Sequence, residues 1–263
     1  MSGVVIQANL QHSKAATACL MQDMLESKKG VIALVQEPHL GNRASPVGIP
    51  GSINSYHHML GGRVAIFSKD CDLLLCPEYS GKDVLVCQLA MSSSREIFVV
   101  TAYADNNIDH LPPSLDRLLE DKEGSEFIIA IDTNAHSSMW GSADPNHRGD
   151  MLEEFIFKHS LTICNRGQRP TFVARGFSTI IDITLCSNSL VDNIKRWEVA
   201  TEDHFSDHRR IQFRLDLEVR APKVGWATKR ADWGRFTSLM RDKSLNFRPH
   251  WYWTANTLDR EVR

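Results

Sequence analysis

Polar side chains recur in this chain where apolar stretches end, most clearly at Asp132-Thr133-Asn134 after the apolar run 127–131. A carboxylate and an amide two residues apart are not side chains expected in a hydrophobic core. They face the same way if the strand continues and lie at a sheet edge if it stops. Other apolar runs end in Asn9, Glu37 and Tyr103. We therefore expect these side chains to converge on one site around Asp132 and Asn134.

A carboxylate–histidine pair is the second chemical feature. Asp182 interrupts the apolar run 180–185, and burying a lone carboxylate costs several kcal/mol, so this residue needs a partner. His208, in Ser206-Asp207-His208 before the last predicted strand, is the obvious candidate. A carboxylate that holds an imidazole fixes its tautomer and raises its pKa, which is how enzymes orient a histidine.

The remaining groups have the chemistry of a metal-assisted hydrolase. Glu37 and Asp207 are hard oxygen ligands suited to Mg²⁺, which keeps several of its waters, and to Mn²⁺. Asn9, Tyr103 and Asn134 add neutral donors that stabilise charge developing on a phosphate. Such a set suits hydrolysis of a phosphodiester by a metal-assisted water.

Strands and helices alternate throughout residues 4–217, which predicts an α/β fold. Apolar spacing predicts helices at 14–28, 112–122 and 148–159. Four β-rich runs between residues 63 and 104 favour an antiparallel meander (63–68, 72–76, 83–90 and 96–104). Further strands are expected at 4–9, 31–35, 127–131, 161–165, 170–174, 180–186, 196–200 and 211–217. About twelve strands suffice for two packed sheets with helices outside.

Composition excludes several classes of protein. With 263 residues and 42% hydrophobic side chains, the chain can bury a substantial core. No run of about 18 apolar residues exists, so we expect no membrane span. The N-terminus lacks the basic and apolar regions of a secretory signal. The six cysteines are scattered without a CxxC pair, so we expect reduced core residues in an intracellular protein.

The net charge of −2 hides an asymmetry. Residues 220–263 hold 10 Lys/Arg against 4 Asp/Glu, whereas residues 1–219 hold 20 against 28. An acidic body is unlike a generic DNA-coating protein, whose affinity comes from phosphate neutralisation. We therefore expect a domain at 1–219, followed by a basic, Trp-containing linker or the start of a missing downstream region at 220–263.

Six motifs in one order resemble the endonuclease/exonuclease/phosphatase superfamily: Gln7-Ala8-Asn9, Gln36-Glu37-Pro38, Thr101-Ala102-Tyr103, Asp132-Thr133-Asn134-Ala135-His136-Ser137, Ile181-Asp182-Ile183-Thr184 and Ser206-Asp207-His208. Two elements resemble one subgroup more closely, the apurinic-like endonuclease domain of insect-type non-LTR (LINE-type) retrotransposons. They are the Asp132–Ser137 motif followed by Trp140, and Pro170-Thr171-Phe172.

This resemblance implies a four-layer α/β sandwich whose two mixed, largely antiparallel sheets are flanked by helices. It implies a nuclear enzyme that nicks one strand of double-stranded DNA and leaves a 3′-hydroxyl to prime reverse transcription by a downstream domain. Carried over by motif, Glu37 is the main Mg²⁺ ligand, with Asp207 nearby and Asn9 at the edge of the metal. Asp132 and Asn134 position the water and the phosphate, Asp182 holds His208, Tyr103 contacts the phosphate, and Asn106 supplies a further amide. The sequence leaves open whether Asp132 or His208 takes the proton of the water, and whether one metal ion or two bind.

The same motifs also fit related enzymes with a different substrate. The apurinic enzymes have a glycine before the central aspartate, whereas this chain has Ala130-Ile131 there, which counts against abasic-site repair. A phosphatase of the same fold and a non-catalytic binding module fit the motifs as well. Singly, Asn9 also suits a helix cap and Asp182 a structural ion pair.

A candidate DNA-contacting segment lies near residues 166–178. Arg166, Arg169 and Arg175 stand out against the acidic body, and residues 173–178 look like a hairpin tip with Gly176 as the turn residue. The alternative is a solvated basic surface. We expect the hairpin to enter a DNA groove and set site preference by shape as much as by base contacts, with Arg166, Thr171 and Arg175 as DNA-binding residues.

Overall fold

Two six-stranded sheets pack face to face in the computed structural model, which describes residues 2–217 except 43, 59–60, 92–94 and 109. The predicted linker at 220–263 lies outside the described residues. The first sheet has the order β13-β14-β1-β2-β4-β3: Ile194–Val199, Ile211–Asp216, Ser2–Asn9, Val31–Gln36, Val64–Lys69 and Asn54–His57. The second has the order β5-β6-β7-β8-β12-β9: Leu73–Leu75, Val84–Leu89, Ile97–Tyr103, Glu126–Asp132, Asp182–Ser187 and Leu161–Ile163.

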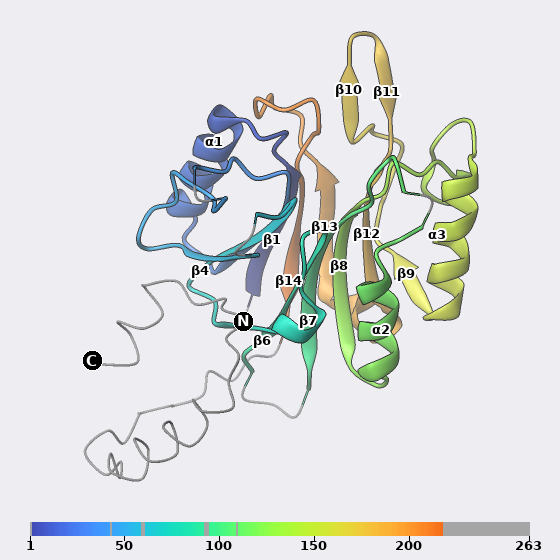
Figure 1. Ribbon diagram of the computed structural model, residues 1–263, viewed down its shortest axis with the longest axis horizontal. Coiled ribbons are helices and arrows are strands. Elements are labelled where there is room, and N and C mark those ends of the chain that lie inside the picture. Colours follow the sequence, from blue (N-terminus) through green and yellow to red (C-terminus); the bar gives the residue numbers. More distant parts are fainter. Residues whose placement is uncertain (1, 43, 59–60, 92–94, 109, 218–263) are drawn as a thin grey trace.

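Both sheets are mixed and largely antiparallel, as predicted. The strand pairs β1–β2 and β7–β8 are parallel, and the other ladders of the two sheets are antiparallel. Helix α1 (Lys14–Glu26) lies outside the first sheet, and α2 (Pro113–Asp121) and α3 (His147–Lys158) lie outside the second (Figure 1). Short 3₁₀ turns complete the elements at Pro77–Tyr79, Ser138–Trp140 and Asn188–Asn193.

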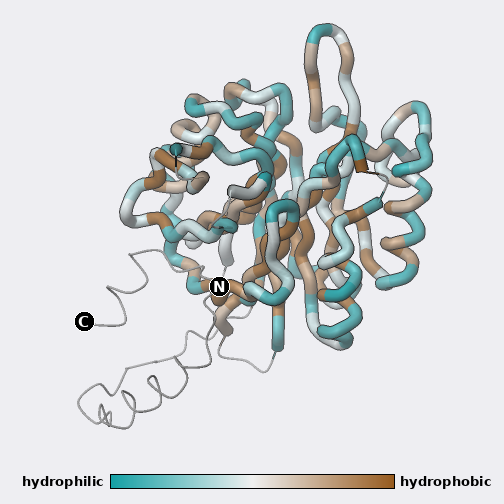
Figure 2. The backbone as a smooth tube through the Cα atoms, in the orientation of Figure 1, coloured by the Kyte–Doolittle hydropathy of each residue, from teal (hydrophilic) through white to brown (hydrophobic). Residues whose placement is uncertain are grey.

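Three hydrophobic clusters fill the spaces between four layers. One packs Leu20 and Met24 of α1 against Phe67, and one lies between the sheets. The third packs the second sheet against residues of α2 and α3. Successive residues of β8 alternate between clusters, because neighbouring strand side chains point to opposite faces. Both faces of the second sheet are covered at β8, so the sequence of this strand is a continuous apolar run. Figure 2 shows hydrophobic residues gathered along the strands. The expected four-layer sandwich is confirmed.

The predicted meander is wrong in its first strand. Residues 64–69 form β4, which pairs with β2 and β3 in the first sheet, whereas β5, β6 and β7 form an antiparallel run in the second. The chain crosses between sheets after Lys69, a step that local spacing does not reveal. Strand β3 was not among the predicted strands.

The helices follow the predicted spacing with small shifts at their ends. Ser13, rather than Asn9, caps α1, because its side chain accepts a hydrogen bond from the Ala16 N–H at 3.1 Å. All six cysteines are free thiols, and five of them are buried. Within the part of the chain that the structure describes, no helix is long and apolar enough to cross a membrane.

Candidate active site

Strand ends at one end of the sandwich surround a cavity of about 280 Å³. Seven predicted site residues line it: Asn9, Glu37, Tyr103, Asn106, Asp132, Asn134 and His208. The strand register brings them together. Asn9 of β1 pairs with Gln36 in the parallel β2, and Tyr103 of β7 pairs with Asp132 in the parallel β8. The carboxyl ends of these strands therefore meet at the same edge.

Asp132, Asp182 and His208 form a buried triad at this cavity. Asp182 begins the antiparallel β12 opposite Asp132, and its carboxylate lies 2.9 Å from Nδ1 of His208. Nε2 of His208 lies 4.0 Å from Oδ2 of Asp132, which also accepts a hydrogen bond of 2.8 Å from the Asn9 amide. The exposed fractions are 2% for both aspartates and 6% for the histidine. The predicted pairing of Asp182 with His208 is present.

Burial sets the charges of the triad. It raises the pKa of Asp132 to about 7, together with the negative charge of Asp182. Burial alone lowers the pKa of His208, but the charge and hydrogen bond of Asp182, with the charge of Asp132, raise it to about 9. At neutral pH His208 is therefore an imidazolium between two carboxyl groups, and Asp132 titrates close to neutrality.

Two site residues have left-handed backbones that the sequence does not indicate. Glu37 has φ 45° and Asn134 has φ 49°. Asparagine tolerates this region, but a glutamate there is uncommon and stores strain. Glu37 directly follows β2 and Asn134 is the second residue after β8, so the turn redirects the chain where the side chain is needed. Strain of this kind concentrates at functional sites.

The donors at the cavity fit a hard divalent cation. The Glu37 carboxylate lines the cavity, and Oδ1 of Asp132 is buried without a hydrogen-bond partner in the described structure. The Asn9 amide oxygen accepts the N–H of Gln11 at 2.9 Å, which fixes the side chain that steadies Asp132. Carboxylate oxygens of this type are the ligands that Mg²⁺ and Mn²⁺ prefer.

Asp207 lies apart from this group. It is exposed beside a second cavity, of about 440 Å³, that is formed largely by residues 201–209. Its carboxylate accepts a hydrogen bond of 3.3 Å from Nε2 of Gln11, and its N–H donates to Oε1 of the same side chain at 2.9 Å. The structure therefore does not place Asp207 among the lining residues with Glu37, and its predicted part in metal binding stays a prediction.

The predicted hairpin is present and projects from the end of the sandwich that holds the cavity (Figure 1). Strands β10 (Phe172–Ala174) and β11 (Phe177–Thr179) are joined by Arg175 and Gly176, with φ 43° and 84°. Positive φ at both central residues defines the tight hairpin turn that matches strand twist. Arg175 is exposed at this turn, and Phe177 is 57% exposed while lining the cavity.

The other predicted DNA-contacting residues differ in placement. Arg166 is exposed in the loop before the hairpin, and Arg169 is tied by its guanidinium to the Val199 carbonyl at 2.9 Å. Thr171 is wholly buried, and its hydroxyl accepts the N–H groups of Ile181 and Asp182 at 3.1 and 3.0 Å. This burial argues against the predicted DNA contact and makes Thr171 a positioning residue for the triad aspartate.

Arg148 is a positioning residue that the sequence does not single out. Its guanidinium donates to the carbonyls of Ala104, Asp105, Ile108 and Thr133, at distances between 2.8 and 3.2 Å. It thereby joins the segment that bears Asn106 to the segment that bears Asn134. The sequence does not indicate this role of Arg148, because the hydrogen-bond acceptors are backbone carbonyls of two separate loops.

Two buried glutamines connect the sheets beneath the cavity. Gln7 of β1 donates to the carbonyls of Ile131 and Ile183, both at 3.4 Å, and accepts the Thr184 hydroxyl at 2.8 Å. Gln36 of β2 donates to the Thr101 hydroxyl at 3.0 Å. Buried polar groups of this kind specify one alignment when they are paired. These contacts set the two sheets in register directly under the strand ends that line the cavity.

His136 joins the cavity lining from the segment after Asn134. Its Nδ1 lies 3.0 Å from the Ser142 hydroxyl and 3.3 Å from that of Thr179. On the opposite wall, the Arg63 guanidinium lies 4.7 Å from the centre of the Tyr103 ring and pairs with Asp83 and Asp105. Burial and the charge of Glu37 raise the pKa of Tyr103 to about 12, so its hydroxyl keeps its proton at neutral pH.

Comparison with known proteins agrees with this geometry. Residues 97–212 match the family model described as "Endonuclease-reverse transcriptase". The chain is 26% identical over 178 residues to the Pol polyprotein of the type-1 retrotransposable element R1 of Bradysia coprophila. It is 29% identical to the endonuclease domain of TRAS1, a telomere-specific non-LTR retrotransposon, with a TM-score of 0.72 over 82% of this chain and 99% of that one. These matches indicate a nuclease that is similar to the endonucleases of non-LTR retrotransposons.

The chain shares its fold with more distant nucleases as well. The AP endonuclease LMAP of Leishmania major is 13% identical, with a TM-score of 0.67 over 82% of this chain and 88% of that one. The 3′ phosphatase NExo of Neisseria is also 13% identical, with a TM-score of 0.58 over 81% and 99%. The alignment to the R1 polyprotein covers 60% of this chain and 18% of the polyprotein. The expected superfamily fold and nuclease class are confirmed.

Proposed function

We propose that this endonuclease uses Mg²⁺ to nick one strand of double-stranded DNA and leaves a 3′-hydroxyl that primes reverse transcription. The observation that carries the proposal is the buried triad beneath a cavity that Glu37 also lines. A scaffold for binding alone has no use for a strained glutamate and two buried carboxyl groups there. The R1 relative is a Pol polyprotein, which supports a reverse transcriptase as the downstream partner. The proposed place of action is the nucleus, because that is where the target DNA lies.

Asp132 is the residue that we assign to take the proton of the attacking water. Its Oδ1 has no hydrogen-bond partner in the described structure, whereas its Oδ2 is held by Asn9 at 2.8 Å. A pKa near 7 suits a general base at neutral pH. His208, protonated and fixed by Asp182, is a donor for a phosphate oxygen as negative charge grows on it. This division of roles is our proposal for the question that the sequence leaves open.

Mg²⁺, or Mn²⁺ in its place, would neutralise charge on the phosphate and on the leaving oxygen, with Glu37 as its ligand. Around that position, Asn134 and Asn106 offer amide donors at the cavity wall. Tyr103 offers a phenol that stays protonated. Hydrogen bonds from such fixed neutral groups hold a phosphate without adding further charge.

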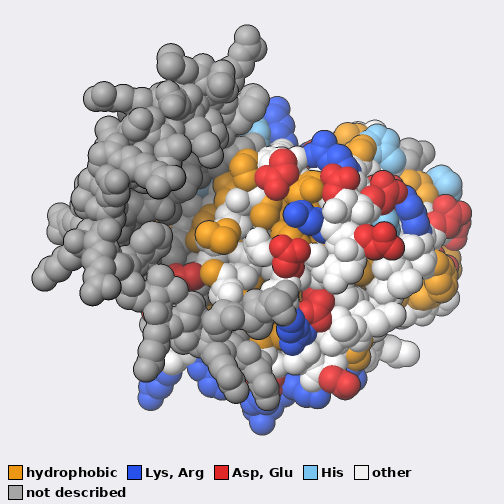
Figure 3. All heavy atoms as spheres, turned by 90° about the horizontal axis from the view of Figure 1, so that it is seen from below, with side chains coloured by type: hydrophobic (Ala, Val, Ile, Leu, Met, Phe, Trp, Pro, Cys, Tyr) orange, Lys and Arg blue, Asp and Glu red, His pale blue; other side chains and the backbone are white. Residues whose placement is uncertain are grey.

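The β10–β11 hairpin is proposed to enter a DNA groove and to set site preference. Its first strand is fixed to the triad, because the Phe172 ring lies 4.9 Å from the His208 ring and Val173 N–H donates to the Asp207 carbonyl at 2.8 Å. Its exposed tip carries Arg175 and Phe177. By contrast, the described residues visible at the opposite end of the sandwich show acidic and basic side chains interspersed (Figure 3), a pattern that does not mark a nucleic-acid surface.

Nicking of a supercoiled plasmid by the purified chain in Mg²⁺ tests the catalytic part. Glu37→Ala should abolish nicking. Glu123→Ala should not, because it removes an exposed carboxylate just before β8 begins, at the end of that strand away from the cavity. Asp207→Ala decides whether that residue acts at the metal, which predicts loss of nicking, or only orders Gln11. Nicked product should be extended by a DNA polymerase without prior treatment if the 3′ end is a hydroxyl. Nicking by pure Glu37→Ala would overturn the site assignment.

Two further arms test the substrate. An abasic oligonucleotide should be cut no better than an intact one, and a strong preference for it would favour abasic-site repair. Replacing residues 173–178 by Gly-Ser residues should change the nick positions mapped on a long DNA. Unchanged positions would remove the hairpin from site selection.

A further inference from the structure

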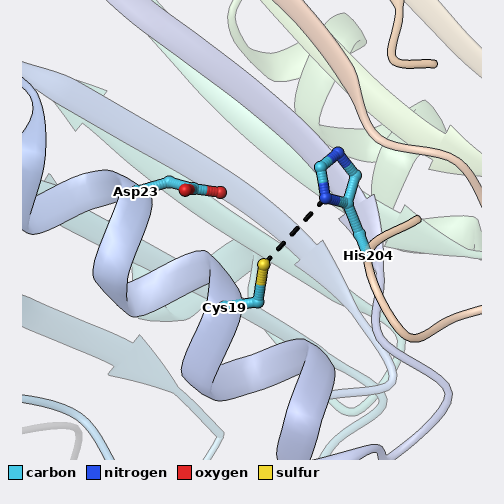
Figure 4. A group of neighbouring side chains, drawn as sticks. All are labelled: Cys19, Asp23 and His204. Atoms are coloured by element: carbon cyan, nitrogen blue, oxygen red, sulfur yellow. Dashed lines mark hydrogen bonds between the residues drawn. The ribbon is translucent and has the colours of Figure 1, made fainter. Parts of the chain in front are cut away.

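Cys19, Asp23 and His204 form a second cluster of potential ligands, away from the cavity (Figure 4). Cys19 and Asp23 stand four residues apart on α1, so their side chains share one face of the helix. His204 comes from the segment between β13 and β14. Its Nδ1 lies 4.0 Å from Sγ of Cys19, and one ligand atom from each of the three residues falls within 4.8 Å of the others.

The histidine and the thiol are both available to a metal. Burial and the positive charge of Arg210 lower the pKa of His204, which favours the neutral ring that ligates metals. Cys19 is partly exposed, whereas the other five cysteines are buried in the hydrophobic clusters. A thiolate, an imidazole and a carboxylate together form a ligand set typical of zinc.

Asp23 is already oriented for such a role. Its Oδ2 accepts a hydrogen bond from Nη1 of Arg210, whose Nη2 donates to the Ala16 carbonyl at 3.2 Å. Arg210 is 4% exposed and therefore fixed in place. A ligating carboxylate is commonly held by an outer partner of this kind through one oxygen while the other faces the metal.

We propose that Cys19, Asp23 and His204 bind a zinc ion that joins α1 to the segment before His208. Three protein ligands leave a fourth position, which a water molecule would fill. The proposal does not depend on the nuclease function, because none of the three residues lines the catalytic cavity.

A zinc ion here would restrain the segment 201–207. That segment has polar attachments to β1 and its following turn, through the Ser206 hydroxyl on the Asn9 carbonyl at 2.8 Å and through Gln11 on Asp207. Phe205 on the same segment is 60% exposed and has φ 63°, so its packing contributes little restraint. Zinc would add a direct bond to the helix and slow the exchange of the amide hydrogens of 201–207.

Binding of Co²⁺ and Zn²⁺ to the full chain tests the proposal independently of catalysis. Co²⁺ bound to a thiolate gives a sulfur-to-metal charge-transfer absorption, which the carboxylates and histidine of the catalytic cavity do not give. We expect this absorption at one equivalent of Co²⁺ and its loss on addition of Zn²⁺. Cys19→Ser should remove it, and His204→Asn should weaken binding on the order of tenfold or more. His110→Asn, an exposed histidine elsewhere, should leave it unchanged.

Alkylation of the native chain gives a second measurement. Cys19 should react first among the six cysteines, and Zn²⁺ should protect it, with slower amide exchange at 201–207. If Cys19→Ser proves unstable, protection in the unaltered chain and in His204→Asn still decides the matter. Absence of the charge-transfer absorption, or equal alkylation of Cys19 with and without Zn²⁺, would overturn the proposal.

Discussion

The buried triad and the β10–β11 hairpin lie against each other yet follow opposite physical rules. Asp182 and His208 are almost fully buried and bonded to each other, so their charges depend on their neighbours. Arg175 and Phe177 at the hairpin tip are exposed. Changes in the triad should therefore alter whether DNA is cut, and changes at the tip should alter where.

Thr171 and Phe172 show how the two regions are connected. Thr171 is buried against the backbone of Ile181 and Asp182, and the next residue packs its ring against His208. The hairpin is thus a projection from the catalytic wall rather than a separate module. This arrangement predicts that DNA held by the tip meets the cavity at a fixed distance.

Among changes in the triad, Asp132→Asn should have the largest effect. If Asp132 takes the proton of the water, nicking should fall by about 10²–10⁴-fold with the fold intact, because an amide cannot accept it. Single-turnover nicking measures this loss. Activity within tenfold of the unaltered chain would contradict the assignment.

The same variant makes an unusual stability prediction. The folded pKa of Asp132 is about 7, above the value of 3.8 in the unfolded chain, so the folded state binds more protons between these values. The carboxylate therefore costs stability as pH rises from about 4 through 7. Without added metal, Asp132→Asn should unfold at a higher temperature than the unaltered chain at pH 8, and the difference should shrink at pH 5.

Asp182→Asn should have the next largest effect, acting through His208. The raised folded pKa of His208 means that its protonation stabilises the fold fully below pH 6.5, and this contribution is lost as pH rises through about 9. Without the Asp182 charge and hydrogen bond, that pKa should fall, which proton NMR of the ring can follow. Nicking at neutral pH should fall roughly 10²-fold.

A matched control exists outside the cavity. His159 and Asp116 form another histidine–carboxylate pair, 2.6 Å apart between Nε2 and Oδ1, in which Asp116 is 47% exposed. Asp116→Asn should leave nicking unchanged. Equal losses in the two variants would mean that Asp182 acts through general stability rather than through His208.

Much of the site was predictable because strand exits can be read from the lengths of apolar runs. Asn9, Glu37, Tyr103 and Asp132 end such runs, and parallel pairing then brings them to one edge. The lone carboxylate in the run at Asp182 predicted a buried partner, since its desolvation needs one. The four-layer sandwich was implied by the family resemblance, and the count of about twelve predicted strands agreed with two packed sheets.

Other features depend on which faces meet in space, and the sequence does not encode that locally. Arg148 binds backbone carbonyls, which every residue possesses, so no pattern marks its partners. The crossing of the chain between sheets after Lys69 looks like one more turn of a meander. Thr171 was predicted as a DNA contact from its motif. Only the packing of β12 against it shows that its hydroxyl is buried and accepts the Asp182 N–H.

Thr171→Val tests the boundary between the two regions. The loss of one acceptor strands two buried N–H groups, and we expect a loss of about 1–3 kcal/mol in the free energy of unfolding. Nick positions should stay the same. Thr201→Val, at an exposed threonine, should stay within about 0.5 kcal/mol of the unaltered chain. A change in nick positions without loss of stability would restore Thr171 as a DNA contact.

Arg175→Ala should have the smallest effect on the protein and a specific one on DNA. Arginine and alanine both carry a Cβ, so a φ of 43° at this position disfavours them equally. The free energy of unfolding should therefore stay within about 0.5 kcal/mol of that of the unaltered chain. If the guanidinium neutralises one phosphate, the slope of log affinity against log salt should fall by about 1. Lys195→Ala, which removes an exposed cation near the start of β13, should leave the slope unchanged.

Phe177→Ala should instead leave the slope intact and redistribute the nicks, because an exposed ring beside the cavity reads the shape of a groove and not its charge.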